Sequence, residues 1–242
     1  MAVRVLSDNF AFVVGRVGEA VVVDPGEADP VIRVLDEEGL RLRQILVTHH
    51  HADHTGGCRA LKKRYDVPVA APQDPRIADV DMTLEDEAMF TLCGLEWKAL
   101  ATPGHTRSHM AYYLRAADAL FTGDALINGA CGRLLDGTAA QMLASLRRIA
   151  SLPDETRIFG GHDYLSENMR FALRVEPDNA DARARLEAYG DARSQDALFA
   201  LLREEKKTNP FLRTTSDSIR CLLNMKQADD VAVLAELRRR KD

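Results

Sequence analysis

Short apolar runs alternate with polar turn residues along the chain as far as about residue 165. Runs of this kind, rich in Val, Ile and Phe and bounded by Gly, Asp or Asn, predict β-strands. The predicted strands are Val3–Leu6, Phe10–Val14, Ala20–Val23, Gln44–Val47, Val67–Ala71, Met89–Leu92, Leu95–Ala101, Met110–Leu114, Ala119–Thr122 and Arg157–Gly160.

Helical spacing of apolar residues fills three of the intervals between these strands. Asp29-Pro30 has the form of an N-cap followed by proline at the first helical position. Thr138 and Gln141 form a capping-box pattern. The predicted helices are Asp29–Glu38, Gly57–Tyr65 and Thr138–Ala150.

The pattern changes after residue 165, where strand signals give way to amphipathic helical stretches. We therefore expect a mixed α/β domain over residues 1–165 and a small all-helical domain over residues 166–242. The helices predicted in the second domain are Ser166–Glu176, Asp181–Tyr189, Gln195–Glu205, Asp217–Asn224 and Asp229–Arg240.

Composition narrows the class of protein. With 46% hydrophobic and 29% charged residues the chain has an ordinary globular composition, and no run approaches the length of a membrane helix. The net charge of −5 disfavours nucleic acid as a partner. No signal peptide is recognisable at the first residues, so we expect a cytoplasmic protein. Four scattered cysteines without a C-x-x-C pair predict free or buried thiols.

The segment Thr48–Gly57 reads THHHADHTGG and follows directly on an apolar strand. Residues two apart in an extended segment point the same way, so His49 and His51 can converge on one cation. Asp53 and His54 open the next turn and can face a second cation. Imidazole and carboxylate ligands suit Zn(II), and also Fe(II) or Mn(II).

Three later residues complete this predicted metal site, because each follows an apolar strand and has glycine beside it. They are His105 in PGHT, Asp124 in TGD and His162 in GGH. A carboxylate can bridge two cations, which makes Asp124 the bridging candidate. His50 and His109 are expected not to be ligands.

In combination, these motifs resemble the metallo-β-lactamase superfamily, whose fold is an αβ/βα sandwich with a metal site at one edge. A narrower resemblance, along nearly the whole chain, is to the glyoxalase II (hydroxyacylglutathione hydrolase) family. The segments that carry it are Gly123–Leu126, Cys131–Thr138, Gly161–Tyr164 with Asn168, Phe171 and Ala172, Val175–Asn179, Asn209–Arg213, and Arg238 with Lys241 and Asp242.

That resemblance implies hydrolysis of S-D-lactoylglutathione to D-lactate and glutathione, a step of methylglyoxal detoxification, by a hydroxide bridging two cations. It implies one cation on His49, His51 and His105, and a second on Asp53, His54 and His162, with Asp124 bridging. Asp53 and Asp124 are thus also the predicted catalytic residues. Zn(II) is the expected metal, with Fe or Mn as alternatives. Glutathione contacts are implied at Arg133, Tyr164, Arg238 and Lys241.

Two departures from the family pattern bear on the substrate. This chain has Leu135 where members often carry an aromatic residue, and Asp163 where they often carry glutamate. Both put the preference for glutathione in question.

Several alternatives remain open from the sequence. Another thioester or lactone hydrolase, or a persulfide dioxygenase with one iron, would use the same fold. A metal-binding protein without catalysis is disfavoured, because structural zinc sites are mostly rich in cysteine. A secreted β-lactamase and an RNA-processing enzyme fit poorly with the missing signal peptide and the acidic balance. We expect a small-molecule substrate, no nucleic-acid or membrane partner, and a monomer or weak oligomer.

Overall fold

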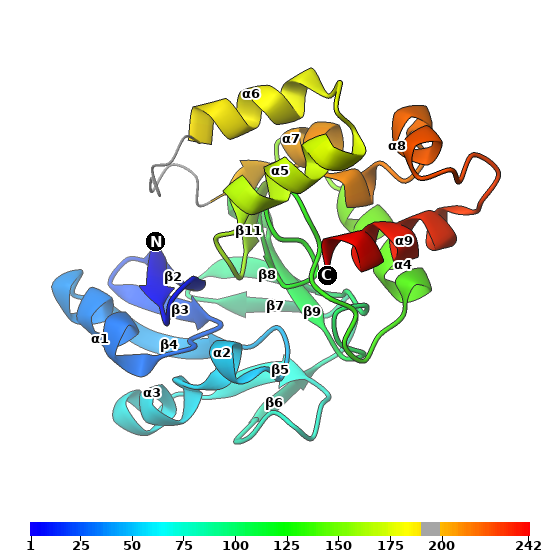
Figure 1. Cartoon of the computed structure of the whole chain (residues 1–242). Helices are drawn as coiled ribbons and strands as arrows, with labels where there is room; N and C mark the ends of the chain where they lie inside the picture. The colour runs from blue at the N-terminus through cyan, green and yellow to red at the C-terminus, as the bar shows by residue number, and fades with distance from the viewer. Residues whose placement is uncertain (190–198) are drawn as a thin grey trace. The chain divides into compact units, whose positions relative to one another are not determined.

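The computed structural model describes residues 1–189 and 199–242, and its contacts divide the chain into two compact units (Figure 1). The first unit comprises Met1–Ala101, Ser108–Gly123 and Gly161–Asp163; the second comprises Thr102–Arg107, Asp124–Gly160 and Tyr164–Asp242. These units interleave along the chain. The domain boundary expected at residue 165 stays a prediction.

A six-stranded sheet in the order β1-β2-β3-β4-β5-β6 forms one layer of the first unit. Its first three strands are antiparallel, and β3 to β6 are parallel. The strands are β1 (Ala2–Val5), β2 (Asn9–Arg16), β3 (Glu19–Val23), β4 (Arg41–Leu46), β5 (Val69–Pro72) and β6 (Met82–Leu84).

Alternation along β2 separates the two faces of this sheet. Ala11 and Val13 join a buried cluster with Val31 and Leu35 of helix α1 (Ala28–Glu37). Leu61 of α3 (Cys58–Tyr65) belongs to the same cluster, so the two helices cover this face (Figure 1). Because side chains in a strand alternate with period two, Phe10 and Phe12 point to the opposite face.

A second sheet packs against that opposite face within the same unit. Phe12 lies 5.4 Å from Phe121 of β10 between ring centroids, and Phe121 lies 5.7 Å from Trp97 of β8. The four antiparallel strands are ordered β10-β9-β8-β7. They are β7 (Met89–Leu92), β8 (Leu95–Ala101), β9 (Met110–Leu114) and β10 (Ala119–Gly123), with the 3-10 helix η1 (Arg115–Ala117) before β10.

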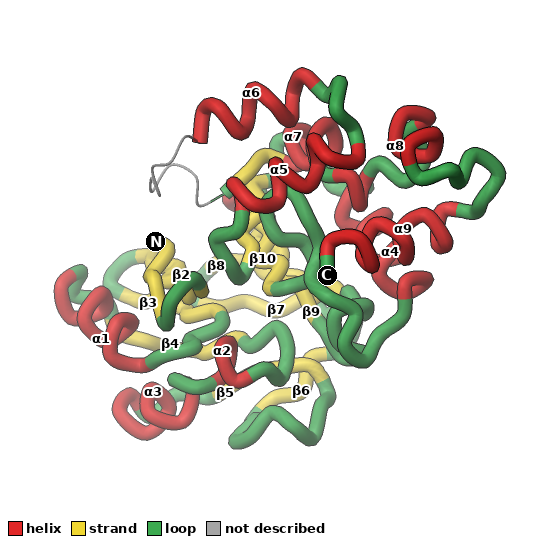
Figure 2. Tube along the Cα trace, viewed as in Figure 1, coloured by secondary structure: helices red, strands yellow, loops and turns green. Residues whose placement is uncertain are grey.

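The second unit is mainly helical (Figure 2). Its one described strand pair joins β11 (Arg157–Gly160) to β12 (Ala200–Leu201), and Leu165, Met169, Ala172 and Ala182 form a local core between α5 and α6. The helices are α4 (Ala139–Ala150), α5 (Leu165–Val175), α6 (Ala180–Tyr189), α7 (Leu202–Thr208), η3 (Pro210–Leu212), α8 (Asp217–Leu222) and α9 (Asp230–Lys241).

Most predicted elements are confirmed to within a few residues, including the Thr138–Gln141 capping box. The cap predicted at Asp29 is wrong, because α1 begins at Ala28 with Glu27 at the N-cap. The sequence pattern missed β6, which is short and half exposed, and the four-residue helix α2 (Ala52–Thr55).

The helix predicted over Gln195–Glu205 lies partly outside the described residues. Within them, Ala200 and Leu201 pair as a strand and the helix begins at Leu202. All four cysteines are free, as expected. Among the described helices, none combines the length and apolar character that crossing a membrane would require.

Candidate metal centre

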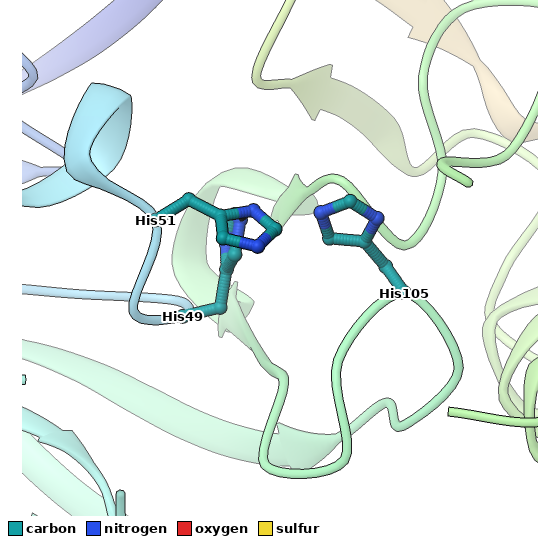
Figure 3. Close-up of side chains that lie close together, drawn as sticks. All are labelled: His49, His51 and His105. Atoms are coloured by element: carbon teal, nitrogen blue, oxygen red, sulfur yellow. Dashed lines mark hydrogen bonds between the residues drawn. The ribbon is translucent and has the colours of Figure 1, made fainter. Parts of the chain in front are cut away.

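The loop that follows β4 carries two histidines whose rings approach each other closely (Figure 3). His49 Nε2 lies 3.0 Å from His51 Nδ1, and the ring of His49 is fully buried. Strand β4 ends at Leu46, and the backbone of Thr48 accepts a hydrogen bond from Met110 N at the start of β9. The loop is thereby tied to both sheets of the first unit. Figure 3 also draws His105, which follows β8 and belongs to the second unit.

A second group of ligand atoms in the first unit comes from helix α2 and the segment after β11. Asp53, His54 and His162 each offer one atom, and these atoms lie within 4.8 Å of one another. Asp53 Oδ2 is 3.6 Å from His54 Nε2 and 3.5 Å from His162 Nε2. The ring of His54 also lies 4.2 Å from that of His49 between centroids, so the two groups are neighbours.

These spacings fit the coordination of a divalent cation. Two ligand atoms about 2.1 Å from one cation at a tetrahedral angle lie about 3.4 Å apart. The separations of 3.0, 3.5 and 3.6 Å are close to that value. Imidazole nitrogen and carboxylate oxygen are donors that Zn, Fe and Mn accept. The donor set of the first unit therefore suits a divalent metal ion.

Hydrogen bonds from residues that are not ligands orient the buried histidines, and several of these bonds are accepted by Asp24. Asp24 Oδ1 accepts from Thr48 N at 2.7 Å, and Oδ2 accepts from Thr48 Oγ1 at 2.7 Å. His54 Nδ1 lies 3.0 Å from the same Oδ2, and His49 Nδ1 lies 3.0 Å from Thr48 Oγ1. Since a carboxylate only accepts, both histidines carry their proton on Nδ1 and leave Nε2 able to bind a cation.

The turn between β1 and β2 contributes hydrogen bonds to two further ligand side chains, those of His162 and Asp53. Asp8 Oδ1 lies 3.2 Å from His162 Nδ1, which leaves Nε2 of that ring as the ligand atom. Asn9 Nδ2 donates to Asp53 Oδ2 at 2.8 Å and lies 3.5 Å from His162 Nε2. This turn therefore orients two of the ligand side chains.

His50 and His109, the two histidines expected not to be ligands, lie beside a carboxylate and another imidazole respectively. His109 is buried and stacks on His49 with ring centroids 4.9 Å apart. His50 Nδ1 lies 3.5 Å from a carboxylate oxygen of Asp74. Hydrogen bonds from Arg76 hold the pKa of Asp74 well below its usual range, despite the burial of that carboxyl.

Within the second unit, the remaining predicted ligands lie side by side. His105 Nε2 is 3.4 Å from Asp124 Oδ2, and His105 Nδ1 is 2.7 Å from the carbonyl oxygen of Arg133. A Cβ atom on Gly132 would lie 2.4 Å from the Asp124 carbonyl and 2.8 Å from the His105 ring. Only glycine permits this approach, which explains the glycine before Arg133.

The basic end of α9 rests on an aromatic pair in the second unit. Arg238 Cζ lies 5.2 Å from the ring of Phe211, and Lys241 Nζ lies 5.7 Å from that of Phe171; the two rings are stacked. Arg238 is buried and donates to the carbonyl of Cys131 at 2.6 Å. Burial lowers the pKa of Lys241 below its ordinary value of 10.5.

The other predicted substrate contacts lie around the same segments. Arg133 is largely exposed, with Nε 3.7 Å from a carboxylate oxygen of Asp242. Leu135 is exposed and donates its N–H to the carbonyl of His105 at 3.2 Å. Tyr164 is half-buried at the N-terminus of α5. Asp163, of the first unit, pairs with Arg4 at 2.8 Å.

Sequence reasoning missed Asp8, Asn9 and Asp24, which support the ligands without being ligands themselves. Each had a signal in the sequence. Asp8-Asn9 lies between two apolar strands, and Asp24 ends the run Val21–Val23 just before Pro25-Gly26. A positive φ of 51° at Asp24 turns the carboxylate inward, a conformation that Asp and Asn tolerate better than most residues.

Comparison with known proteins covers the whole chain. A sequence model described as "Metallo-beta-lactamase superfamily" matches residues 5–92 and 75–162, and one described as "Hydroxyacylglutathione hydrolase C-terminus" matches residues 163–242. A hydroxyacylglutathione hydrolase of Synechococcus sp. is 44% identical, covering 98% of this chain and 96% of that protein. Those of Ruegeria pomeroyi and Methylococcus capsulatus are 41% and 42% identical, each covering 100% of this chain and 97% of the relative.

Solved structures confirm the α/β fold of metallo-β-lactamase type. The BLEG-1 B3 metallo-beta-lactamase has a TM-score of 0.69 at 25% identity, covering 88% of this chain and 98% of its own. ETHE1 from Myxococcus xanthus has a TM-score of 0.67 at 25% identity, with coverage of 96% and 92%. TTHA1623, solved in a di-iron-bound form, has a TM-score of 0.62 at 27% identity, with coverage of 84% and 95%.

Proposed function

This chain belongs to the hydroxyacylglutathione hydrolase family of the metallo-β-lactamase superfamily, and we propose that it hydrolyses S-D-lactoylglutathione to D-lactate and glutathione. The observation that carries the proposal is the pair of adjacent ligand groups in the first unit. Each group has atoms at the spacing of ligands on one cation, and His49, His54 and His162 are held with Nε2 unprotonated.

We assign His49 and His51 to one cation, and Asp53, His54 and His162 to the other, with His105 added to the first and Asp124 bridging. Chain connectivity supports the last two assignments. Asp124 is bonded to Gly123, whose carbonyl accepts from Gly161 N at 2.9 Å, one residue from His162. His105 lies in a short loop whose two ends are held by strands of the first unit.

Two divalent cations, when bound at such a site, acidify a shared water molecule and polarise the carbonyl of the substrate. Hydrogen bonds from neighbouring residues hold the ligand side chains in the orientation that the cations require. Asp24 and Asp8 accept the Nδ1–H groups of His54 and His162 and so keep Nε2 of each ring free of a proton, and Asp53 can also orient the attacking water. The thiol of glutathione is already fairly acidic, with an ordinary pKa of about 8.5 for a cysteine thiol, so its departure needs no strong general acid.

Arg133, Tyr164, Arg238 and Lys241 are the proposed contacts of the glutathione part. Lys241 and Arg133 are the better candidates for direct contact with its carboxylates. Arg133 is exposed, and the ion pair between the Lys241 ammonium group and Glu167 is long, at 3.8 Å. Arg238 donates a hydrogen bond to the Cys131 carbonyl, so its main effect is to hold α9 against the loop that carries Arg133.

Zn(II) is the metal we propose for both positions, with Fe and Mn as substitutes that the same donors accept. The role in methylglyoxal detoxification, the cytoplasmic location, the monomeric or weakly oligomeric state and the absence of a nucleic-acid partner remain predictions from the sequence. The alternatives of a lactonase or a persulfide dioxygenase are not favoured, because the relatives cited above match over nearly their full length.

A single assay tests the proposal. Protein is stripped with a chelator and assayed on S-D-lactoylglutathione before and after adding back Zn(II), while metal content is measured on the same samples. We expect activity to vanish with the metal and to return with about two equivalents. Full activity in protein shown to be free of metal would refute the proposal, as would reloaded protein that leaves the thioester intact.

A further inference from the structure

Asn9 lies where one amide group can reach two of the proposed ligand atoms. Its Nδ2 donates to Asp53 Oδ2 at 2.8 Å and lies 3.5 Å from His162 Nε2. Those two atoms are themselves 3.5 Å apart, close to the separation of about 3.4 Å expected for two ligands on one cation. The hydrogen bond to Asp53 leaves that carboxylate oxygen a second lone pair for a cation, whereas His162 Nε2 has a single lone pair, which a cation would take in place of the longer contact with Asn9.

Proton positions make this arrangement consistent. Asp8 Oδ1 accepts from His162 Nδ1 at 3.2 Å, so His162 Nε2 carries a lone pair that can bind a cation. Asp53 Oδ2 is a carboxylate oxygen and can accept from Asn9 while keeping a lone pair for a cation. The amide therefore aligns Asp53 Oδ2 beside His162 and leaves that oxygen able to bind a cation.

The backbone holds Asn9 in this position. Asn9 pairs with His162 in an antiparallel bridge, and Phe10 N donates to Gly161 O at 2.9 Å. On the other side of His162, Asp163 N donates to Asp8 O at 3.0 Å. Asn9 is only 4% exposed, so its side chain has little freedom to turn away.

Asp53 needs such a support more than the histidines do. Its side chain is 35% exposed, whereas those of His54 and His162 are 1% and 9% exposed. A partly exposed carboxylate loses rotamer freedom when it binds a cation, and a hydrogen bond made beforehand removes part of that cost.

We propose that Asn9 is a positioning residue that presets the second cation position, by holding Asp53 Oδ2 at ligand spacing from His162 Nε2 before the cation arrives. The inference rests on the proposed two-cation centre and deepens it. It concerns only the position formed by Asp53, His54 and His162. The side-chain contacts of Asn9 described above are with Asp53 and His162, so we expect the position formed by His49 and His51 to be unaffected.

Metal titration of the Asn9→Ala variant tests this role. Stripped protein is titrated with Zn(II) against a chromophoric chelator, and separately with Co(II) by its visible spectrum. We expect one of the two equivalents to bind about 10 to 100 times more weakly than in the unaltered chain, the size of effect typical for an outer hydrogen bond to a metal ligand. The affinity of the other equivalent should stay within about twofold of that in the unaltered chain.

Two further variants keep the test decisive. Asn9→Leu keeps the branched shape of the side chain while removing both donors, so it replaces Asn9→Ala if the latter fails to fold when stripped of metal. Ser7→Ala alters an exposed residue of the same turn and should bind both equivalents normally. Thermal unfolding of each stripped protein checks the fold.

The possible failures are distinguishable. If the unaltered chain binds two equivalents and a folded Asn9 variant does the same with equal affinity, Asn9 has no positioning role. Equal weakening of both equivalents would also overturn the inference, because it would indicate a general loss of structure. If the unaltered chain itself binds fewer than two equivalents, the proposed two-cation centre fails and the inference with it.

Discussion

Replacing Asp24 with asparagine changes one atom at the centre of the hydrogen bonds behind the metal centre. Asp24 is 2% exposed and has a φ of 51°, a conformation that asparagine also adopts. The substitution preserves shape and backbone but turns one carboxylate oxygen into an NH2 donor. Thr48 N, Thr48 Oγ1 and His54 Nδ1 all donate to this carboxylate in the native chain.

Neither orientation of the new amide satisfies these donors. If the NH2 group takes the Oδ1 position, it faces the N–H of Thr48, and two donors then meet with no acceptor between them. With NH2 at the Oδ2 position, it donates to His54 Nδ1 and to Thr48 Oγ1, and Thr48 then donates to His49 Nδ1. Both histidines would be driven to the tautomer protonated on Nε2, the nitrogen that must bind the cation. The result is a loss of ligand quality at both cation positions.

The magnitude follows from the bonds involved. A hydrogen bond to a charged group contributes about 1.5 to 3 kcal/mol, and the amide recovers part of what is lost. We expect Asp24→Asn to cost about 2 kcal/mol of unfolding free energy in stripped protein, which lowers Tm by about 4 to 8 °C in a chain of this size. Both metal equivalents should bind about 10 to 100 times more weakly.

Metal titration and thermal unfolding measure these quantities on the same preparation. Asp36→Asn is a matched control, because Asp36 is 59% exposed and its 3.4 Å contact with Arg64 is a surface ion pair. It should change stability by less than about 0.5 kcal/mol and leave metal binding intact. Asp24→Asn protein that binds both equivalents with native affinity would refute the argument from tautomers. The pattern also differs from that of the Asn9 variants, in which one equivalent alone should weaken.

Two further predictions concern the second unit. Lys241→Gln should raise KM for S-D-lactoylglutathione by about 3- to 10-fold, the equivalent of about 0.7 to 1.4 kcal/mol, with kcat changed less than about twofold. Steady-state kinetics checks this against Arg239→Gln, which removes the same charge from an exposed neighbour; equal effects of the two changes would contradict a specific contact. Burial raises the pKa of the Cys131 thiol from 9.0 to about 11. The folded state therefore keeps this proton where the unfolded state has lost it, so unfolding free energy should fall between pH 9 and 11, by up to about 1.4 kcal/mol per pH unit. Unfolding free energy, measured with denaturant across this range, should fall less steeply with pH in Cys131→Ala than in the native chain. An equal dependence on pH would contradict the prediction.

Much of this protein was determined by its sequence alone. Strands and helices are local consequences of apolar spacing and turn residues, so most were predicted to within a few residues. The predicted ligands are also readable from the chain, because His49, His51, Asp53 and His54 lie within one short segment. The exceptions are elements that tertiary packing decides. The strand Ala200–Leu201 pairs with Arg157–Ile158, a distant segment that no local pattern announces.

Only the tertiary structure decided how the ligands are supported. Asp24, Asp8 and Asn9 are ordinary turn residues in the sequence, and they acquire a role because sheet formation brings them against His54, His162 and Asp53. Arg238 opens a run of four basic residues in the sequence, yet folding buries it against Phe211 and the Cys131 carbonyl. The physical reason is the same in each case. A hydrogen bond or a buried charge depends on partners far away in the chain, and their positions are set by the packing of whole elements.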